Sequence, residues 1–333
     1  MREAIAFVPF LVAACVSEEA SQDGVELDDP FSLEGGKSDQ VFEPTRFPIV
    51  LVHGFNASPQ KNGFGPEVVS ALCADGHSVF APQTPAFASA AERGEVLADA
   101  IDAILDGATD ACGRTPTAPP TKVNIIAHSM GGLDTRFVIG SLGYGDRIDS
   151  VITISTPHRG SAIADMMLGL LDKVDSEALS ALASFLGRPL GDDSPDLLAA
   201  MTSLAEASSG EFEAENPDDH RVRFQSWAGL SNVAGIINPR DVLACENKLI
   251  GFSSVFDRHV MHVALKPIAF VVAHGAALNP NDGLVRVESA KWGTFRGCIP
   301  ADHADEVGAF PNGKFPHVDF LRRRAFELAA TGA

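Results

Sequence analysis

The sequence predicts a doubly wound α/β domain over residues 45–333 of a 333-residue chain. Near-continuous apolar runs, the pattern of strands buried on both faces, occur at 47–52, 123–127 and 151–155. Between them, apolar residues recur at helical spacing, as at Val68, Val69 and Leu72. Hydrophobic residues make up 45% of the chain, which is enough for a sizeable core. Strands and helices that alternate in this way form a mostly parallel sheet with helices on both faces.

The remaining elements follow in order along the chain. A short strand is expected at 78–81, and a second helical pattern at 96–105. The loop 115–121 contains three prolines and leads into the strand at 123–127. Strand character returns at 223–227, and a C-terminal helix is expected from His317 onward.

Residues from about 160 to 222 are predicted to be an insertion over the sheet. Two apolar helical faces mark it, formed by Ile163, Met166, Met167, Leu170 and Val174 and by Leu179, Leu182 and Leu186. Two interpretations stay open. The faces are either ordinary core packing on the sheet, or the inner surface of a mobile lid that turns to an acyl chain.

The N-terminal segment is typical of an exported protein. Residues 1–15 combine an early Arg2 with an apolar run, which predicts a signal peptide too short to span a membrane. The run ends in Leu-Val-Ala-Ala-Cys, which resembles a bacterial lipobox and predicts a lipid on Cys15. Residues 16–44 carry nine acidic residues and one lysine, so we expect a flexible tether. The sequence therefore predicts a cell-envelope lipoprotein or a secreted protein, with the lipid on Cys15 as its membrane anchor.

The charge balance excludes several classes of partner. Twenty-five Lys and Arg against forty-four Asp and Glu give a net charge of −19. Nucleic-acid binding requires a basic surface, so we expect no nucleic acid as a partner. The same excess of acid argues against electrostatic docking on anionic lipid. No apolar stretch is long enough for a membrane-spanning helix.

The strongest chemical signal is Ala-His-Ser-Met-Gly at 127–131, directly after the strand at 123–127 and before a helical pattern. This is the G-x-S-x-G pattern with Ala at its first position. A sharp strand-to-helix turn requires small residues two positions before and after Ser129, and it exposes the hydroxyl at the carboxyl end of the sheet. The context predicts Ser129 as a nucleophile, because the helix that follows directs N–H groups at developing negative charge.

A second element supports this chemistry. His53, Gly54 and Phe55 follow the first buried strand, where an α/β-hydrolase supplies one N–H of its oxyanion hole. The backbone N–H groups of Phe55 and Met130 are the predicted donors. His53 is expected to hold the loop rather than transfer protons.

Activation of a serine needs a base that a carboxylate orients. His303, in a loop after the last strand, is the best-placed histidine, and His317 is its rival at the start of the C-terminal helix. Asp282 lies in an Asn-Asp-Gly turn predicted at a strand end, and Asp302 is the rival acid. The order Ser129, Asp282, His303 is that of α/β-hydrolases.

Taken together, these stretches resemble the bacterial true lipases of the α/β-hydrolase superfamily, the Pseudomonas and Burkholderia type of triacylglycerol lipase. The resemblance rests on residues 47–55, 123–136, 156–161 with Asp165, 281–285 and 303–306. It implies the α/β-hydrolase fold with a helical lid, and the triad of Ser129, Asp282 and His303.

The same resemblance implies a structural calcium ion near the catalytic histidine. Its ligands would include Asp305, two residues after His303, and an aspartate before the triad acid, for which Asp257 is the nearest match. The alternative is that Asp305 caps or pairs locally. No cofactor is expected for the chemistry itself. Some of these lipases require a dedicated foldase, so the resemblance makes a foldase a candidate partner.

With Cys15 set aside, four cysteines remain, and an even number in an exported chain favours disulfides. Four cysteines allow three pairings, and we favour the pairing that is local in sequence, Cys73–Cys112 and Cys245–Cys298. The alternative is a set of buried free thiols. The chain has no C-x-x-C motif, so a zinc site is not expected.

These features predict a serine hydrolase of carboxylic esters, with a lipid ester at an interface as the substrate of a triacylglycerol lipase. A short-chain carboxylesterase, a polyester depolymerase and an acyltransferase would share every catalytic feature. From another class, a non-catalytic hydrolase-like binding protein would keep the fold without the turnover.

Overall fold

Six strands form one sheet in the order β2-β1-β3-β4-β5-β6, and every neighbouring pair is parallel. The strands are β1 (Ile49–Val52), β2 (Val79–Phe80), β3 (Val123–His128), β4 (Ile148–Ile154), β5 (Arg223–Gly229) and β6 (Thr294–Ile299). This computed structural model describes residues 43–61, 63–169, 195–252, 260–309 and 315–333. The predicted α/β class with a parallel sheet is confirmed.

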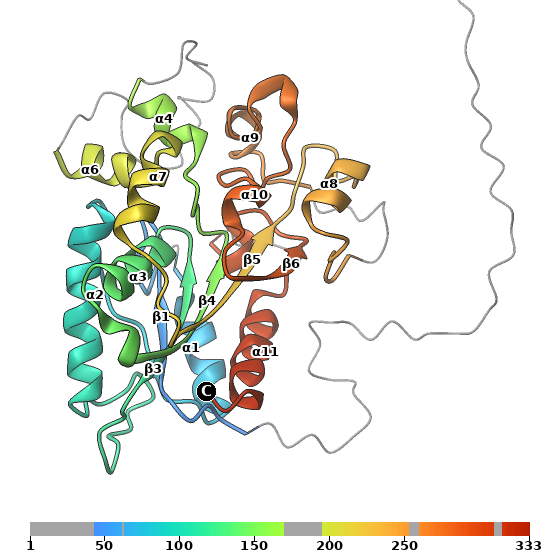
Figure 1. The fold of residues 1–333 in the computed structure, drawn as a ribbon. Helices are drawn as coiled ribbons and strands as arrows, with labels where there is room; N and C mark the ends of the chain where they lie inside the picture. Colours follow the sequence, from blue (N-terminus) through green and yellow to red (C-terminus); the bar gives the residue numbers. More distant parts are fainter. Residues whose placement is uncertain (1–42, 62, 170–194, 253–259, 310–314) are drawn as a thin grey trace, which may run out of the picture.

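Helices cover both faces of the sheet (Figure 1). Ile49 and Leu51 pack under α1 (Gly65–Ala74) and α11 (His317–Ala330). Val50 and Val52 pack under α2 (Ala90–Leu105) and α3 (Gly131–Gly140). Successive side chains of a strand point to opposite faces, so a continuous apolar run such as β1 serves both layers at once.

Two long excursions leave the sheet at the carboxyl ends of its strands (Figure 1). The first, between β4 and β5, contains α4 (Ala162–Met167), α6 (Pro195–Leu204) and α7 (Glu206–Glu215). The second, between β5 and β6, contains α8 (Pro239–Ala244), α9 (Lys266–Val272), the 3₁₀ turn η2 (Gly275–Ala277) and α10 (Val287–Ala290). The other 3₁₀ turns are η1 (Tyr144–Asp146) and η3 (Asp305–Val307). Both excursions therefore lie at the end of the sheet where β3 leads into Ser129.

One expectation about this region is wrong, and one strand of the sheet was not predicted. In the described residues, no strand leads directly into Asp282. The element before it is η2, and the neighbouring Asn281 forms isolated β-bridges to Ser231 and Arg286. The Asn-Asp-Gly signal marks a turn but does not determine which element precedes it. The edge strand β6 is absent from the predicted strands because it carries Arg296 and lacks a continuous apolar run.

The predicted insertion at 160–222 is described only in part. Its first apolar face begins as α4 and is described as far as Met167. Leu170, Val174 and the second face, Leu179, Leu182 and Leu186, lie outside the described residues. The lid interpretation therefore stays a prediction. The segments 1–15 and 16–42, with Cys15, also lie outside them.

The two ends of the folded domain meet at the amino end of the sheet. The backbone N–H of Arg46 donates to the carbonyl oxygen of Ala333 at 2.7 Å. No described helix is long and apolar enough to cross a membrane.

Both cysteine pairs that we favoured form disulfides in the structure. Cys73 in α1 is bonded to Cys112 in the loop after α2, with their Cα atoms 5.6 Å apart. Cys245, which ends α8, is bonded to Cys298 in β6, with their Cα atoms 5.5 Å apart. The second bond fastens the long β5–β6 excursion to the sheet edge.

We expect removal of either disulfide to destabilise the protein. The bonds join residues 39 and 53 positions apart, and loops of that length correspond to about 4 kcal/mol each as an upper-end estimate. The double variants Cys73→Ser/Cys112→Ser and Cys245→Ser/Cys298→Ser should unfold at clearly lower denaturant than the wild type. Unchanged midpoints for both double variants would contradict this, and peptide mapping without reductant checks the pairing.

Candidate active site

Ser129 lies on the turn between β3 and α3 with a positive φ of 54°, a conformation that non-glycine residues seldom adopt. Its backbone N–H donates to the Ile154 carbonyl at 2.9 Å, and the Thr156 hydroxyl donates to its own carbonyl at 2.8 Å. These bonds from β4 and the residues after it hold the strained residue in place.

The small residues of the motif have a steric reason. A Cβ on Gly131 would lie 2.5 Å from the carbonyl oxygen of Val52 in β1. A Cβ on Gly132 would lie 2.1 Å from the hydroxyl oxygen of Thr156. Ala127, two residues before Ser129, is fully buried in β3 and accommodates its methyl group there. The first position of the motif therefore accepts alanine, whereas the last does not.

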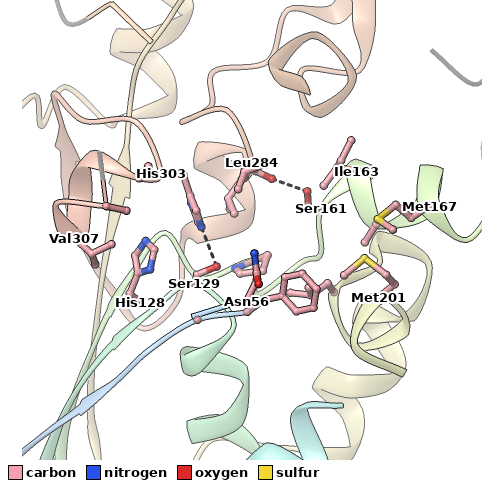
Figure 2. Close-up of a pocket in the computed structure, with 18 of the residues that line it drawn as sticks. Asn56, His128, Ser129, Ser161, Ile163, Met167, Met201, Leu284, His303 and Val307 are labelled. Atoms are coloured by element: carbon pink, nitrogen blue, oxygen red, sulfur yellow. Dashed lines mark hydrogen bonds between the residues drawn. The ribbon is translucent and has the colours of Figure 1, made fainter. Parts of the chain in front are cut away.

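The structure brings Ser129, His303 and Asp282 together. The Ser129 hydroxyl lies 2.9 Å from His303 Nε2, and His303 Nδ1 lies 2.8 Å from Asp282 Oδ2 (Figure 2 draws the first contact). Asp282 Oδ1 also accepts the N–H groups of Leu284 and Val285 at 2.8 and 2.7 Å. Since the carboxylate can only accept, Nδ1 carries the proton and Nε2 is free to accept one from Ser129. This is the arrangement that a general base requires.

The two rival residues have other contacts. His317, at the start of α11, has its Nε2 3.5 Å from Glu67 of α1. Asp302 accepts the N–H groups of Ala304 and Asp305 and that of His262. Asp302 thus shapes the backbone of the loop that carries His303.

The loop 53–55 lies directly over the nucleophile. A Cβ on Gly54 would be 2.7 Å from the Cβ of Ser129, so only glycine allows this approach. Phe55 lines the cavity beside Ser129, and the N–H of Met130 lies at the start of α3. Helix N-termini favour negative charge, which suits the donor role predicted for Met130.

His53 ties this loop to the segment after β2. Its Nδ1 donates to the Gly54 carbonyl at 3.0 Å, and its Nε2 accepts the Thr84 N–H at 3.2 Å. The partners require a neutral ring, and burial lowers the pKa of His53 to about 4. His53 therefore holds the loop, as expected.

A buried ion pair supports the same loop and was not foreseen from the sequence. Arg93 of α2 and Asp134 of α3 are both fully buried and lie 2.8 Å apart. The Arg93 guanidinium also donates to the carbonyl oxygens of His53, at 2.7 Å, and of Pro85. Burial raises the pKa of Asp134 to about 6, against the influence of Arg93. The available signal was a charged residue on the apolar face of α2.

Glu306 is the second residue that sequence reasoning missed. Its carboxyl group is fully buried, 3.0 Å from His128 Nε2, and it accepts the Ser155 hydroxyl at 2.6 Å. Burial raises its pKa well above the usual range, and the Asp282 carboxylate adds to this. Burial and the His303 imidazole hold the pKa of His128 well below its usual range. Both shifts favour the uncharged forms of this pair, and the His128 ring centroid lies 4.6 Å from that of His303.

Ser129 opens into a cavity of about 280 Å³ whose walls are mainly apolar. Figure 2 shows Ile163, Met167 and Met201 on one side of Ser129 and Val307 on the other. Ile163 and Met167 come from α4, and Met201 comes from α6. The described part of the predicted insertion thus supplies part of the cavity wall, while Met166 packs in the core against α9. A cavity of this kind accommodates a hydrocarbon chain next to a serine hydroxyl.

The residues implied for calcium are not assembled in the described part of the chain. Asp305 is buried in η3, and Asp257 lies outside the described residues. Among the residues that the structure describes, the one set of three potential ligands is His128, His303 and Glu306, which are already engaged in the contacts above. The calcium site that the resemblance implies therefore stays a prediction.

Known proteins match this chain in sequence. A family model described as a PGAP1-like alpha/beta domain matches residues 87–184. A triacylglycerol lipase of Vibrio cholerae is 29% identical over 296 residues, which cover 81% of this chain and 82% of the relative. A triacylglycerol lipase of Burkholderia plantarii is 30% identical over 228 residues, covering 64% and 57%.

Solved structures match the fold. A metagenomic carboxyl esterase superposes with a TM-score of 0.56 at 20% identity, covering 86% of this chain and 76% of its own. The Staphylococcus hyicus lipase superposes with a TM-score of 0.55 at 18% identity, covering 87% and 96%. The fold is that of the α/β-hydrolases, and the curated relatives support a lipase family within that superfamily. The protein is a carboxylic ester hydrolase.

We expect acid to weaken the fold through His53. Its pKa is about 4 in the folded protein against 6.5 as the ordinary value, so the folded state takes up the proton less readily. Its contribution to stability is therefore complete above pH 6.5 and is lost as the pH falls through 4, on the order of 3 kcal/mol in all.

Denaturant unfolding of the wild type and of His53→Asn at pH 7 and pH 4.5 checks this. The difference between the two pH values should be smaller in the variant. His220→Asn, which changes an exposed histidine, serves as the control and should keep the wild-type difference. A His53→Asn protein with an undiminished pH dependence would contradict the assignment.

Proposed function

We propose that this protein is a triacylglycerol lipase that cleaves lipid esters through an acyl-enzyme on Ser129. The observation that carries the proposal is the hydrogen-bonded chain from Ser129 through His303 to Asp282, which opens into an apolar cavity. The relatives named triacylglycerol lipase support the substrate class.

The chemistry follows from the geometry. His303 Nε2 takes the Ser129 proton as the hydroxyl oxygen attacks the ester carbonyl, and Asp282 stabilises the imidazolium that forms. The N–H groups of Phe55 and Met130 stabilise the tetrahedral oxyanion. The imidazolium then donates its proton to the departing alcohol, leaving an acyl group on Ser129. Water, deprotonated by His303, releases the fatty acid and restores the hydroxyl.

Several finer assignments belong to the same proposal. We place the chain with the Pseudomonas and Burkholderia type of lipase, on the motifs quoted from its sequence. We propose export, which the two disulfides support, with Cys15 as the lipid anchor and residues 16–44 as the tether. Mass spectrometry that finds an unmodified Cys15 in the mature protein would refute the anchor. A lid at about 160–222 and a foldase partner remain proposals.

Calcium is proposed on the family resemblance alone, with Asp305 as one ligand. Bound there, it would brace the loop that presents His303, and ligand binding to the native state would raise stability. Metal analysis of the purified protein is the direct test. Protein that contains no calcium and whose unfolding temperature ignores EDTA would refute the site.

We expect the triad variants to separate by role. Ser129→Ala should remove nearly all turnover of a p-nitrophenyl ester, and Asp282→Asn should lower kcat by about 10⁴-fold, by analogy with the serine-protease template. His303→Ala should match the loss at Ser129, whereas His317→Ala should retain most of the activity. Equal losses at His303 and His317 would overturn the assignment of the base. Full turnover by Ser129→Ala would overturn the proposed nucleophile.

We expect substitution of Met167 to affect the hydrolysis of long-chain esters more than that of short-chain esters. A carboxylate at this position of the cavity wall would have to lose water to an acyl chain. Met167→Asp should therefore lower hydrolysis of emulsified long-chain triglyceride much more than hydrolysis of a soluble short-chain ester. Met167→Leu keeps the size and the apolar character and should preserve both activities.

The same pair of assays, together with an acyl-transfer assay and a polyester assay, distinguishes the alternatives. A wild type that cleaves only the soluble ester would be a short-chain carboxylesterase. Faster transfer to an added alcohol than to water would indicate an acyltransferase, and release of soluble products from a solid polyester would indicate a depolymerase. No turnover of any ester would favour a hydrolase-like binding protein.

A further inference from the structure

Exposed apolar side chains are concentrated in one part of this molecule. Nine large hydrophobic residues are exposed in the described chain, and six of them lie on the segments 233–236 and 260–278. We call these six the apolar face: Val233, Ile236, Val260, Val263, Phe270 and Leu278. Val263, Leu278 and Phe270 are 72%, 59% and 54% exposed. Surface apolar residues are ordinarily scattered, so such a concentration marks an interaction site.

The two segments are joined to each other. Asn232 and Val260 form a parallel bridge, and the Met261 N–H donates to the Asn232 carbonyl at 3.1 Å. The Asn232 side chain closes its own loop, because its Oδ1 accepts the N–H groups of Ala234, Gly235 and Ile236. The loop that carries Val233 and Ile236 is thus fastened beside the segment that carries Val260 and Val263.

The apolar face continues from the mouth of the cavity. Ala264, next to Val263, lines the cavity that contains Ser129. The other side of α9 is anchored in the core through Leu265, Ile268 and Val272, which leaves Phe270 facing outward. Figure 1 shows α9 above the carboxyl ends of the strands, the end at which β3 leads into Ser129. Bound material on this face would therefore lie next to the entrance of the active site.

The charge distribution selects the kind of partner. The chain has 44 acidic residues in 333, yet residues 260–280 contain none. Entry into an apolar phase costs least where no carboxylate must lose its water. The chain as a whole carries a net charge of −19, which disfavours anionic lipid, so an uncharged ester phase is the partner that fits.

We propose that the apolar face is the surface by which this protein docks on a layer of neutral lipid, the aggregated ester itself. The proposal rests on the proposed lipase function for the identity of the partner. Docking through α9 and the neighbouring loop would bring Ser129 and its cavity to the lipid, so that an ester passes from the layer into the site without crossing water.

The test uses the full chain with Ser129→Ala, which cannot turn over substrate, and measures flotation with triolein droplets coated with phosphatidylcholine. Protein with the unmodified apolar face should float with the droplets. Val263→Ser with Phe270→Ser should weaken partitioning by about tenfold or more, since both side chains lose their apolar contact with the lipid. Val96→Ser, the same change at an exposed valine on α2, is the matched control and should float normally.

A second measurement does not depend on loss of binding. Val263→Trp in the same Ser129→Ala chain should shift its fluorescence to shorter wavelength when droplets are added, whereas Val96→Trp should not. Equal flotation of the double variant and the control, or no shift for Val263→Trp, would overturn the proposal. So would a dimer that Val263→Ser/Phe270→Ser converts to a monomer without any loss of flotation, because the face would then join two copies of the chain.

Failure of the docking proposal and failure of the proposed function give different results. Flotation of the Ser129→Ala chain without any ester turnover by the wild type would leave the docking face intact and refute the lipase. Hydrolysis of emulsified triglyceride by the double variant at the wild-type rate would leave the lipase intact and refute the face.

Discussion

The left-handed backbone at Ser129 is the constraint on which the rest of the site depends. A serine at a φ of 54° persists only where its surroundings determine it. Here the surroundings are the carbonyl oxygens at the end of β1, which leave no room for a Cβ on Gly131, and the bonds from Ile154 and Thr156. The ends of β1 and β4 therefore hold the residue that presents the hydroxyl. The geometry of the nucleophile thus depends on the same strands that form the core of the sheet.

The site also contains two buried carboxyl groups that lie close together. Asp282, in the excursion before β6, and Glu306, in η3 after it, are both fully buried. They lie on either side of Gly229, where an added Cβ would contact both. The two carboxyl groups have different partners. Asp282 accepts two N–H groups and lies against His303. Glu306 lies against His128 and Ser155, where burial raises its pKa well above the usual range. Asp282 is thus placed to orient the base, while Glu306 is engaged elsewhere.

The sequence predicted much of this because its signals are local and steric. The run at β3 and the small residues around Ser129 must appear in the sequence for the turn to form at all, and a continuous apolar run such as β1 reveals a strand buried on both faces. The parts that it did not predict depend on contacts far apart along the chain. Arg93 is separated from Asp134 by 41 residues and Glu306 from His128 by 178, and nothing near either residue announces the partner. Asp282 was found from its turn, although the strand expected before it is not there, because turn chemistry is independent of the preceding element.

The hydrogen bond between Arg46 and Ala333 places both ends of the described domain on one side of the molecule. In a parallel sheet, the end at which the chain enters β1 is opposite to the end at which Ser129 leaves β3, and Figure 1 shows the C-terminus on that entry side. Both ends of the described domain therefore lie on the side opposite to the catalytic mouth, and neither one narrows the approach of a substrate to Ser129.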